Sequence, residues 1–251
     1  MTDATPAVLV LTPVKDASAF LEGYAERLLA LDYPPERLSV GLLEGDSADD
    51  TAERAAEAVA RLGARFARAG LWRRDFGARF PSVFPRWWGG IQKTRRAALA
   101  RARNRLLFEA LGSEAWVLWL DVDVIEYPAD VLRRLLATGE RIVQPNCVLD
   151  YGGPSFDRNA WAGRRKRYLS DLRGQGDLVR LDGVGGTMLL VHADLHREGL
   201  VFPPFPYRPS TPMRLPRNML AMETEGLALM ARDMGVACWG MPGLEIRHHR
   251  G

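Results

Sequence analysis

The sequence predicts an α/β fold with a mostly parallel, Rossmann-like central sheet flanked by helices. Continuous apolar runs, typical of strands buried on both faces, occupy residues 7–11, 38–43 and 116–120. Segments with helical spacing of apolar residues lie between and after these runs, at residues 20–31, 51–62 and 92–111. This alternation favours parallel strands joined by right-handed crossovers. The 251 residues, 47% of them hydrophobic, are enough for one large domain.

Local signals refine the order of elements. Ser47 is a candidate N-cap for the helix near residue 51, because its hydroxyl can accept a backbone N–H bond. A helix is expected over residues 223–234 and should end at Gly235. Two short strands, at residues 236–239 and 244–246, are expected to follow.

Two stretches show no regular pattern. Residues 70–91 are rich in aromatic residues and glycine and are predicted to be an irregular insertion. Within them, Trp87 and Trp88 fit a core position and a sugar-binding platform equally well. Residues 150–180 are polar and rich in Gly and Arg, which predicts a flexible loop.

Composition excludes several classes of protein. The net charge of +3 comes from 34 basic and 31 acidic residues, and the one short basic cluster, residues 164–167, is much smaller than the face of a nucleic-acid binder. Two cysteines provide no disulfide framework. We see neither a signal peptide nor an apolar run long enough to span a membrane. We therefore expect a cytoplasmic protein without a transmembrane segment, and peripheral membrane contact remains open.

The chemistry begins with two aspartates at a strand end. The apolar run at 116–120 leads directly into Asp121 and Asp123, whose side chains share one face because alternate strand residues point the same way. Carboxylate oxygens suit Mg²⁺ or Mn²⁺ held together with a diphosphate. The alternative for any isolated Asp-x-Asp is a pair of solvated loop acids.

Three other polar segments are expected at the same edge of the sheet. They are residues 12–16, 44–47 and 248–249, each of which follows an expected strand. Ligands of open α/β sheets bind beyond the carboxyl ends of the strands. The four segments therefore predict one crevice for a nucleotide and a metal ion.

This arrangement resembles the GT-A fold of nucleotide-sugar-dependent glycosyltransferases. Three segments carry the resemblance: Gly45-Asp-Ser-Ala-Asp-Asp-Thr51, Ala100-Arg-Ala-Arg-Asn104 and Leu120-Asp-Val-Asp123. A narrower resemblance is to the fungal α-mannosyltransferases of the mannan polymerase complexes. It adds Leu11-Thr-Pro-Val-Lys-Asp16, Asp182-Gly-Val-Gly-Gly186, Glu223-Thr-Glu-Gly226 and the terminal His248, in the family's order. The loop at 150–180 has its own sequence, and the family's N-terminal membrane anchor is not seen.

The family resemblance implies a retaining transferase that uses GDP-mannose and Mn²⁺, with Mg²⁺ as a possible replacement. By that resemblance the metal residues are Asp123, His248 and Asp121. Asp123 and His248 would bind the ion directly, and Asp121 would lie near the ribose or just behind the direct ligands. The residues implied at the nucleotide are Thr12, Pro13, Asp16, Gly45, Asp46, Ser47, Arg103 and Asp121. Among these, Asp46 would read the base, and Arg103 would face the diphosphate or help to hold the nucleotide pocket.

The implied catalytic residues are Glu223, Glu225 and Asp121, near the reacting sugar or the acceptor hydroxyl. A carboxylate there can stabilise a cationic sugar or orient a hydroxyl. In the simpler interpretation, Glu223 is only an acid that favours a helix N-terminus. Arg103 would likewise be only an arginine on a solvated face of its helix.

The resemblance further implies one GT-A domain over residues 1–251. Its nucleotide-binding half would be residues 1–145, and residues 146–251 would form the acceptor-side half and the metal-binding tail. The donor would be a nucleotide sugar, the acceptor a carbohydrate or glycoconjugate, and nucleic acid is not expected as a partner.

Two other functions remain open. A nucleotidyltransferase that makes nucleotide sugars would use a similar sheet, but it is expected to carry a Gly-rich loop after the first strand, and residues 12–16 contain no glycine. A catalytically silent, nucleotide-sugar-binding subunit of a complex is the second alternative. The intact acidic pair and His248 favour an enzyme.

Overall fold

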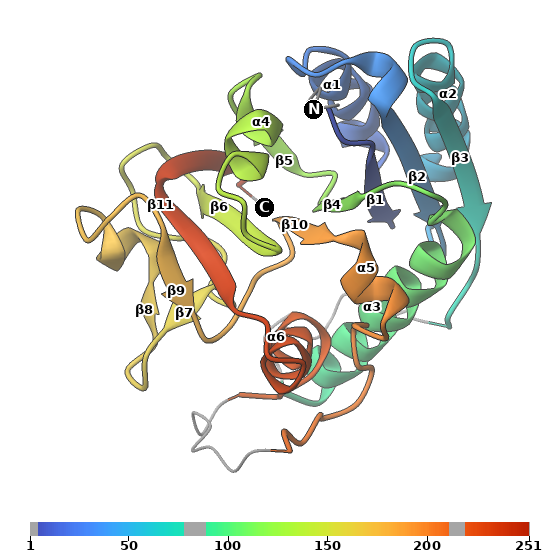
Figure 1. Ribbon diagram of the computed structural model, residues 1–251. Coiled ribbons are helices and arrows are strands. Elements are labelled where there is room, and N and C mark those ends of the chain that lie inside the picture. Colours follow the sequence, from blue (N-terminus) through green and yellow to red (C-terminus); the bar gives the residue numbers. More distant parts are fainter. Residues whose placement is uncertain (1–4, 78–88, 211–218, 251) are drawn as a thin grey trace.

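The structure is a computed structural model that describes residues 5–77, 89–210 and 219–250 (Figure 1). Within these residues, nine strands form one sheet in the order β3-β2-β1-β4-β10-β6-β11-β5, with β9 also paired to β11. The strands of this sheet are β1 (Val8–Val14), β2 (Leu38–Glu44), β3 (Arg68–Arg73), β4 (Trp116–Leu120), β5 (Val124–Glu126), β6 (Ile142–Val148), β9 (Val179–Leu181), β10 (Met188–His192) and β11 (Cys238–His248). The helices are α1 (Ser18–Leu29), α2 (Thr51–Gly63), α3 (Gly89–Ala110), α4 (Val131–Leu136), α5 (Ala193–Arg197) and α6 (Glu223–Asp233), with 3₁₀ turns η1 (Pro35–Arg37) and η2 (Leu169–Leu172).

The direction of the strands decides where the polar segments meet. Strands β3, β2, β1 and β4 are parallel to one another, β10 runs antiparallel to β4 and β6, and β11 is parallel to β6. The carboxyl ends of β1, β2, β4 and β11 therefore lie at the same edge of the sheet. This is the α/β arrangement with a largely parallel sheet that the alternation of elements predicted.

Helices cover both faces of the sheet, and β1 shows how the sequence specifies both. Val8 and Val10 belong to the core that contains α1, α2 and α4. Leu9 and Leu11, which point the other way, belong to the core that contains α3, α5 and α6. Each strand residue thus packs on one helical layer or the other, which explains why the central strands are apolar throughout. Figure 1 shows α1 and α2 together on one side and α3, α5 and α6 on the other.

Two expectations for the irregular stretches were wrong. Part of the predicted insertion is strand β3, which pairs in parallel with β2 at the edge of the sheet. The 150–180 region is not a flexible loop: it contains a small hairpin, β7 (Trp161–Ala162) with β8 (Arg167–Tyr168), followed by η2 and β9. The buried Trp161, Leu169 and Leu172 hold it onto the sheet. Such short strands are specified by tertiary contacts, so the period of the sequence does not reveal them.

Further corrections concern element ends. Ser47 does not cap α2, whose N-cap position is Asp50, because the Ser47 hydroxyl instead accepts the backbone N–H of Asp16 at 3.1 Å. The helix α6 ends as predicted, with Gly235 in the left-handed region at φ 75°. The two expected short C-terminal strands are one strand, β11, with an irregularity between Met241 and Glu245.

No helix in the described parts of the chain is both long enough and apolar enough to cross a membrane.

Candidate active site

The site is built where β4 ends. Asp121 and Asp123 follow this strand, as predicted, and the short strand β5 begins directly after them. Strand β5 pairs with the last residues of β11, with His248 opposite Val124. This pairing brings His248 Nε2 to 3.1 Å from Asp123 Oδ1, and the backbone N–H of His249 donates to the Asp123 carbonyl at 2.9 Å.

The ring of His248 is fixed on three sides. Its Nδ1 lies 2.7 Å from the His249 carbonyl and its Nε2 faces Asp123, while the ring stacks on Phe156 with centroids 4.1 Å apart. Burial lowers the pKa of His248, but the contact with Asp123 outweighs burial and raises that pKa above its ordinary value. Nδ1 donates to the His249 carbonyl, and Nε2 is the nitrogen that faces the Asp123 carboxylate.

Asp123 and His248 fit a divalent ion. Bonds of about 2.1 Å to an octahedral ion place neighbouring ligand atoms about 3 Å apart, close to the spacing seen here. A metal-binding imidazole commonly donates its other N–H to a carbonyl, as His248 does to His249. Among the residues that the structure describes, no group of three or more His, Cys, Asp or Glu side chains is arranged to hold a metal. The remaining positions around such an ion would therefore come from a diphosphate or water.

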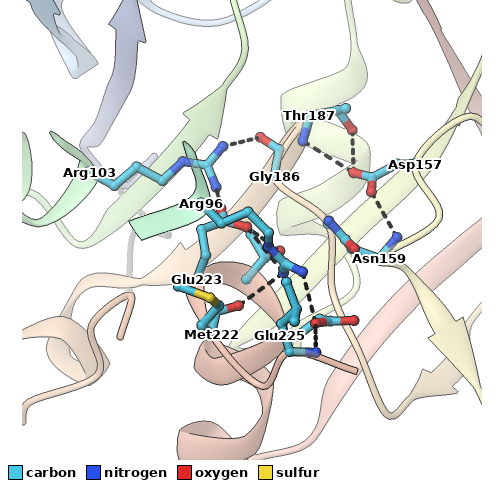
Figure 2. A network of polar contacts seen from close by, with 12 residues as sticks. Arg96, Arg103, Asp157, Asn159, Gly186, Thr187, Met222, Glu223 and Glu225 are labelled. Atoms are coloured by element: carbon cyan, nitrogen blue, oxygen red, sulfur yellow. Dashed lines mark hydrogen bonds and ion pairs between the residues drawn. The ribbon is translucent and has the colours of Figure 1, made fainter. Parts of the chain in front are cut away.

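Asp121 does not join that pair, because its carboxylate turns toward α3. Arg103 Nη2 lies 3.0 Å from Asp121 Oδ1 and also donates to the Gly186 carbonyl at 3.3 Å, while Nη1 pairs with Glu223 (Figure 2). Burial raises the pKa of Asp121 to about 7, an effect that Arg103 opposes and that nearby Asp123 reinforces. Arg103 is fully buried and is therefore not the solvated helix residue of the simpler interpretation.

A second ion cluster lies beside the first. Arg96 Nη1 is 2.9 Å from Glu225 Oε2, and its Nη2 donates to the Met222 carbonyl at 3.0 Å (Figure 2). Glu225 also lies 3.7 Å from Lys166 Nζ and accepts the backbone N–H of Leu220 at 3.0 Å. These three donors are directed at the Glu225 carboxylate and its side chain is 3% exposed, so it acts as a buried anchor.

The backbone that presents Glu223 is unusual. Glu223 and Ala221 have positive φ angles of 55° and 52°, in the left-handed region that residues other than glycine seldom adopt. Such conformations persist where the surroundings enforce them, and they cluster at functional sites. Here Arg103 and Arg96 both approach the Glu223 carboxylate and hold it in place.

The two glycines before β10 allow charged side chains to approach the backbone. A Cβ on Gly185 would overlap the carboxylate of Asp157, and one on Gly186 would overlap the guanidinium of Arg103. Asp157 in turn accepts the Thr187 hydroxyl at 3.0 Å (Figure 2). The glycines are therefore required by close packing against two buried charges.

These groups surround one crevice of about 340 Å³. Its lining comes from four regions: α3 with the start of α6, the ends of β4 and β11, the segment at 156–159, and the turn just before β10. The lining residues are Leu99, Arg103, Asp121, Phe156, Asp157, Arg158, Asn159, Gly186, Thr187, Glu223 and His248.

The other predicted strand-end residues lie at the ends of β1 and β2, and their carboxylates join the loops that follow β1, β2 and β3. The Asp16 carboxylate accepts the Ala48 N–H at 2.7 Å, and the Asp46 carboxylate accepts the N–H groups of Phe76 and Gly77 at 2.8 and 3.1 Å. Both aspartates have left-handed backbones, with φ of 48° and 61°. A Cβ on Gly45 would overlap the Arg74 carbonyl, so this position requires glycine.

Two predicted nucleotide residues differ in their surroundings. Thr12 is fully buried, and its hydroxyl donates to the Leu120 carbonyl at 2.7 Å beside Tyr24, so it links β1 to β4 inside the core. Pro13 is partly exposed and pairs with Leu43 near the end of β1. Trp87 and Trp88, the candidate sugar platform, lie outside the described residues.

The profile of the Anp1 family matches residues 2–173 and 166–206 of the chain. The chain belongs to the Anp1 family. Among Anp1-type relatives, the mannan polymerase complex subunit mnn9 of Schizosaccharomyces pombe is 31% identical over 96% of this chain and 80% of its own. The subunit MNN9 of Candida albicans is 29% identical over 96% of this chain and 74% of its own.

Solved structures show that this Anp1 member has the GT-A fold. A mannosyltransferase from Pyrobaculum calidifontis, solved with GDP-Man and Mn²⁺, superposes with a TM-score of 0.63 at 17% identity, over 98% of this chain and 57% of its own. GalNAc-T7, solved with UDP, GalNAc and Mn²⁺, gives 0.61 at 13% identity, over 98% of this chain and 44% of its own. The predicted GT-A fold is thus confirmed.

Sequence reasoning missed the 156–159 segment of the crevice. Phe156 and Asp157 lie in the region taken for a flexible loop, and their contacts, His248 and Gly185, are far away in the sequence. One signal was available: the paired glycines at 185–186 indicated a close approach, although not the groups that approach.

Proposed function

We propose that this Anp1 member is a metal-dependent mannosyltransferase that moves mannose from GDP-mannose to a carbohydrate or glycoconjugate acceptor with retention. The observation that carries the proposal is the Asp123–His248 pair, with its 3.1 Å spacing, beside the cluster of Arg103, Asp121 and Glu223. The relatives of this chain named above are mannan polymerase subunits, which supports mannose as the sugar.

The nucleotide would lie at the carboxyl ends of β1, β2 and β4, on the half formed by residues 1–145. The loops after β1 and β2 are preorganised by the bonds of Asp16 and Asp46 to backbone N–H groups, so a ligand meets a shaped surface. In this proposal Pro13, Asp16, Gly45, Asp46 and Ser47 form that surface. Thr12 supports it from the core.

Asp123 and His248 would hold Mn²⁺, with Asp121 close behind them. Mixed oxygen and imidazole ligands suit Mn²⁺ better than Mg²⁺, although Mg²⁺ remains possible. Bound there, the ion supplies positive charge that stabilises a departing nucleoside diphosphate more in the transition state than in the ground state.

Of the two glutamates, Glu223 would face the reacting sugar. It lines the crevice and is held by two arginines, so its charge is oriented before any substrate arrives. A carboxylate fixed in this way stabilises positive charge as the sugar becomes cationic. Glu225 does not line the crevice, and we propose that it positions Arg96 and Lys166.

Arg103 would act mainly by holding carboxylates. Its two paired acids neutralise it, so it offers little free charge to a phosphate in this state. A donor that displaced Asp121 from Arg103, toward the metal, would free the guanidinium for a phosphate oxygen. That exchange would give Arg103 and Asp121 linked roles in donor binding.

Hydrolysis of a panel of GDP- and UDP-sugars, with Mn²⁺ and with EDTA, tests the proposal. We expect Mn²⁺-dependent release of GDP from GDP-mannose and little turnover of UDP-sugars. Binding of GDP-mannose without release, even with mannosides added, would point to a catalytically silent protein. NMR of the anomeric proton of the product tests retention.

A further inference from the structure

The crevice contains an apolar pair that the proposed chemistry does not use. Leu99 and Phe156 are 37% and 40% exposed, which is unusual for large hydrophobic residues of this chain, and both line the crevice. Leu99 lies one helical turn before Arg103 on α3, while Phe156 comes from the segment that packs on His248. Two separate segments thus direct apolar surface into one site rich in carboxylates.

A free polar group lies next to this pair. The side-chain amide of Asn159 has no hydrogen-bond partner among the described residues, although its backbone N–H is bonded to Asp157 at 3.2 Å. The amide therefore offers donors and an acceptor to a ligand. Apolar surface with a few well-placed polar groups is the usual lining of a small-molecule site, and about 340 Å³ suits a small ligand.

The charges of the crevice indicate the class of ligand. The crevice is lined by three acids, Asp121, Asp157 and Glu223, and by two arginines, Arg103 and Arg158. Arg103 is already paired with two of the acids, and Arg158 lies over the ring of Tyr168. A neutral polyol can bind beside these groups without disturbing their charge balance, since it carries no charge of its own. A sugar ring has an apolar C–H face, which packs against aromatic and aliphatic side chains, and hydroxyls, which bond to an amide.

We propose that Leu99, Phe156 and Asn159 form the acceptor subsite, and that it binds a neutral hexopyranoside with one face of the ring against the apolar pair. The proposal rests on the transferase function, because it assigns the donor to the side of Asp123 and His248. It also assigns acceptor contacts to the segment at 156–159, which belongs to the half formed by residues 146–251.

Saturation-transfer NMR with methyl α-mannopyranoside, in the presence of GDP and Mn²⁺, tests the subsite without any turnover. We expect the wild type to bind the glycoside, and Leu99→Ala and Asn159→Ala each to weaken binding about tenfold, the scale of one lost apolar contact or hydrogen bond. Phe108→Ala is the matched control, since Phe108 is on the same helix, is 69% exposed and does not line the crevice. Melting curves check that each variant is folded.

Four outcomes decide whether this subsite exists. Equal binding by the wild type and both crevice variants, or no binding by the wild type, overturns the subsite. A rise in the KM for GDP-mannose as large as the loss of glycoside binding also overturns it, because the pair would then hold the donor sugar. Glycoside binding that depends on Leu99 and Asn159 supports the subsite, and absent GDP-mannose hydrolysis would then count against the transferase function alone.

Discussion

Asp123 and His248 lie 125 residues apart in the sequence and meet because β5 pairs with β11. The pairing places Nε2 of the imidazole 3.1 Å from the carboxylate and also joins the backbones, through His249 N–H and the Asp123 carbonyl. The spacing of the two side chains is therefore set by strand register, and the end of β11 is held by the sheet itself.

Asp123→Asn tests the oxygen ligand with little change in shape. We expect the affinity for Mn²⁺ in the presence of GDP to fall by at least about 100-fold, because a neutral amide replaces a charged ligand. Calorimetry of Mn²⁺ binding measures this effect. Glu126→Gln on the adjoining strand, which loses an exposed ion pair with Arg247, should bind Mn²⁺ as the wild type does.

His248→Ala tests the nitrogen ligand against its neighbour. Mn²⁺ affinity should fall and GDP-mannose hydrolysis should be lost, while the strand pairing and the fold remain. His249→Ala should retain both properties, because His249 contacts Asp123 through its backbone and its ring packs on Phe20. Equal effects of the two substitutions would remove His248 from the metal site.

Arg103→Met should destabilise the protein by about 3–5 kcal/mol, since it leaves the Glu223 carboxylate buried without its main partner. Arg105→Met, on the same helix but exposed, should change stability by less than about 0.5 kcal/mol. Urea unfolding measures both. The double variant Arg103→Met/Glu223→Gln should recover part of the loss, and strict additivity would show that the two residues are not coupled.

Gly185→Ala should lower the free energy of unfolding by about 1–3 kcal/mol, because the new methyl group overlaps the Asp157 carboxylate. Gly243→Ala is the matched control: a Cβ there meets nothing within 4 Å. Thermal melting compares the two. If Asp157→Gly in the Gly185→Ala background restores stability, the clash is confirmed as the cause, and failure to restore it would place the strain elsewhere.

His196 should make stability depend on pH. Burial lowers the pKa of His196 to about 4, and the neutral ring accepts from Trp119 Nε1 at 3.2 Å while its Nδ1 meets the Leu200 carbonyl at 2.7 Å. The unfolded chain, with a pKa near 6.5, binds the proton first, so stability is full above pH 6.5 and falls as the pH drops toward 4.

As the pH falls from 7 to 5, His196 alone should lower the free energy of unfolding by roughly 2 kcal/mol. Urea unfolding of the wild type and of His196→Gln at both pH values isolates the effect, since other groups act in both proteins. A variant that loses as much stability as the wild type would contradict the assignment. His196 is a buried core residue.

The sequence determined the elements that form from local patterns. Apolar runs specified the central strands, helical spacing specified α1, α2, α3 and α6, and Asp121 and Asp123 were identified at a strand end because one run stops there. These features depend on residues close together in the chain, so the period of the sequence reveals them. The family resemblance added the order of the motifs and the choice of His248.

Tertiary structure alone decided which charges meet. Nothing local indicates that Arg103 lies between Asp121 and Glu223, that Glu225 is an anchor, or that Asp157 packs on Gly185. The same holds for β3 and for the small hairpin of β7 and β8, which are specified by their pairing and by buried side chains. Contacts between distant residues depend on register and packing, and a single sequence carries no separate signal for them.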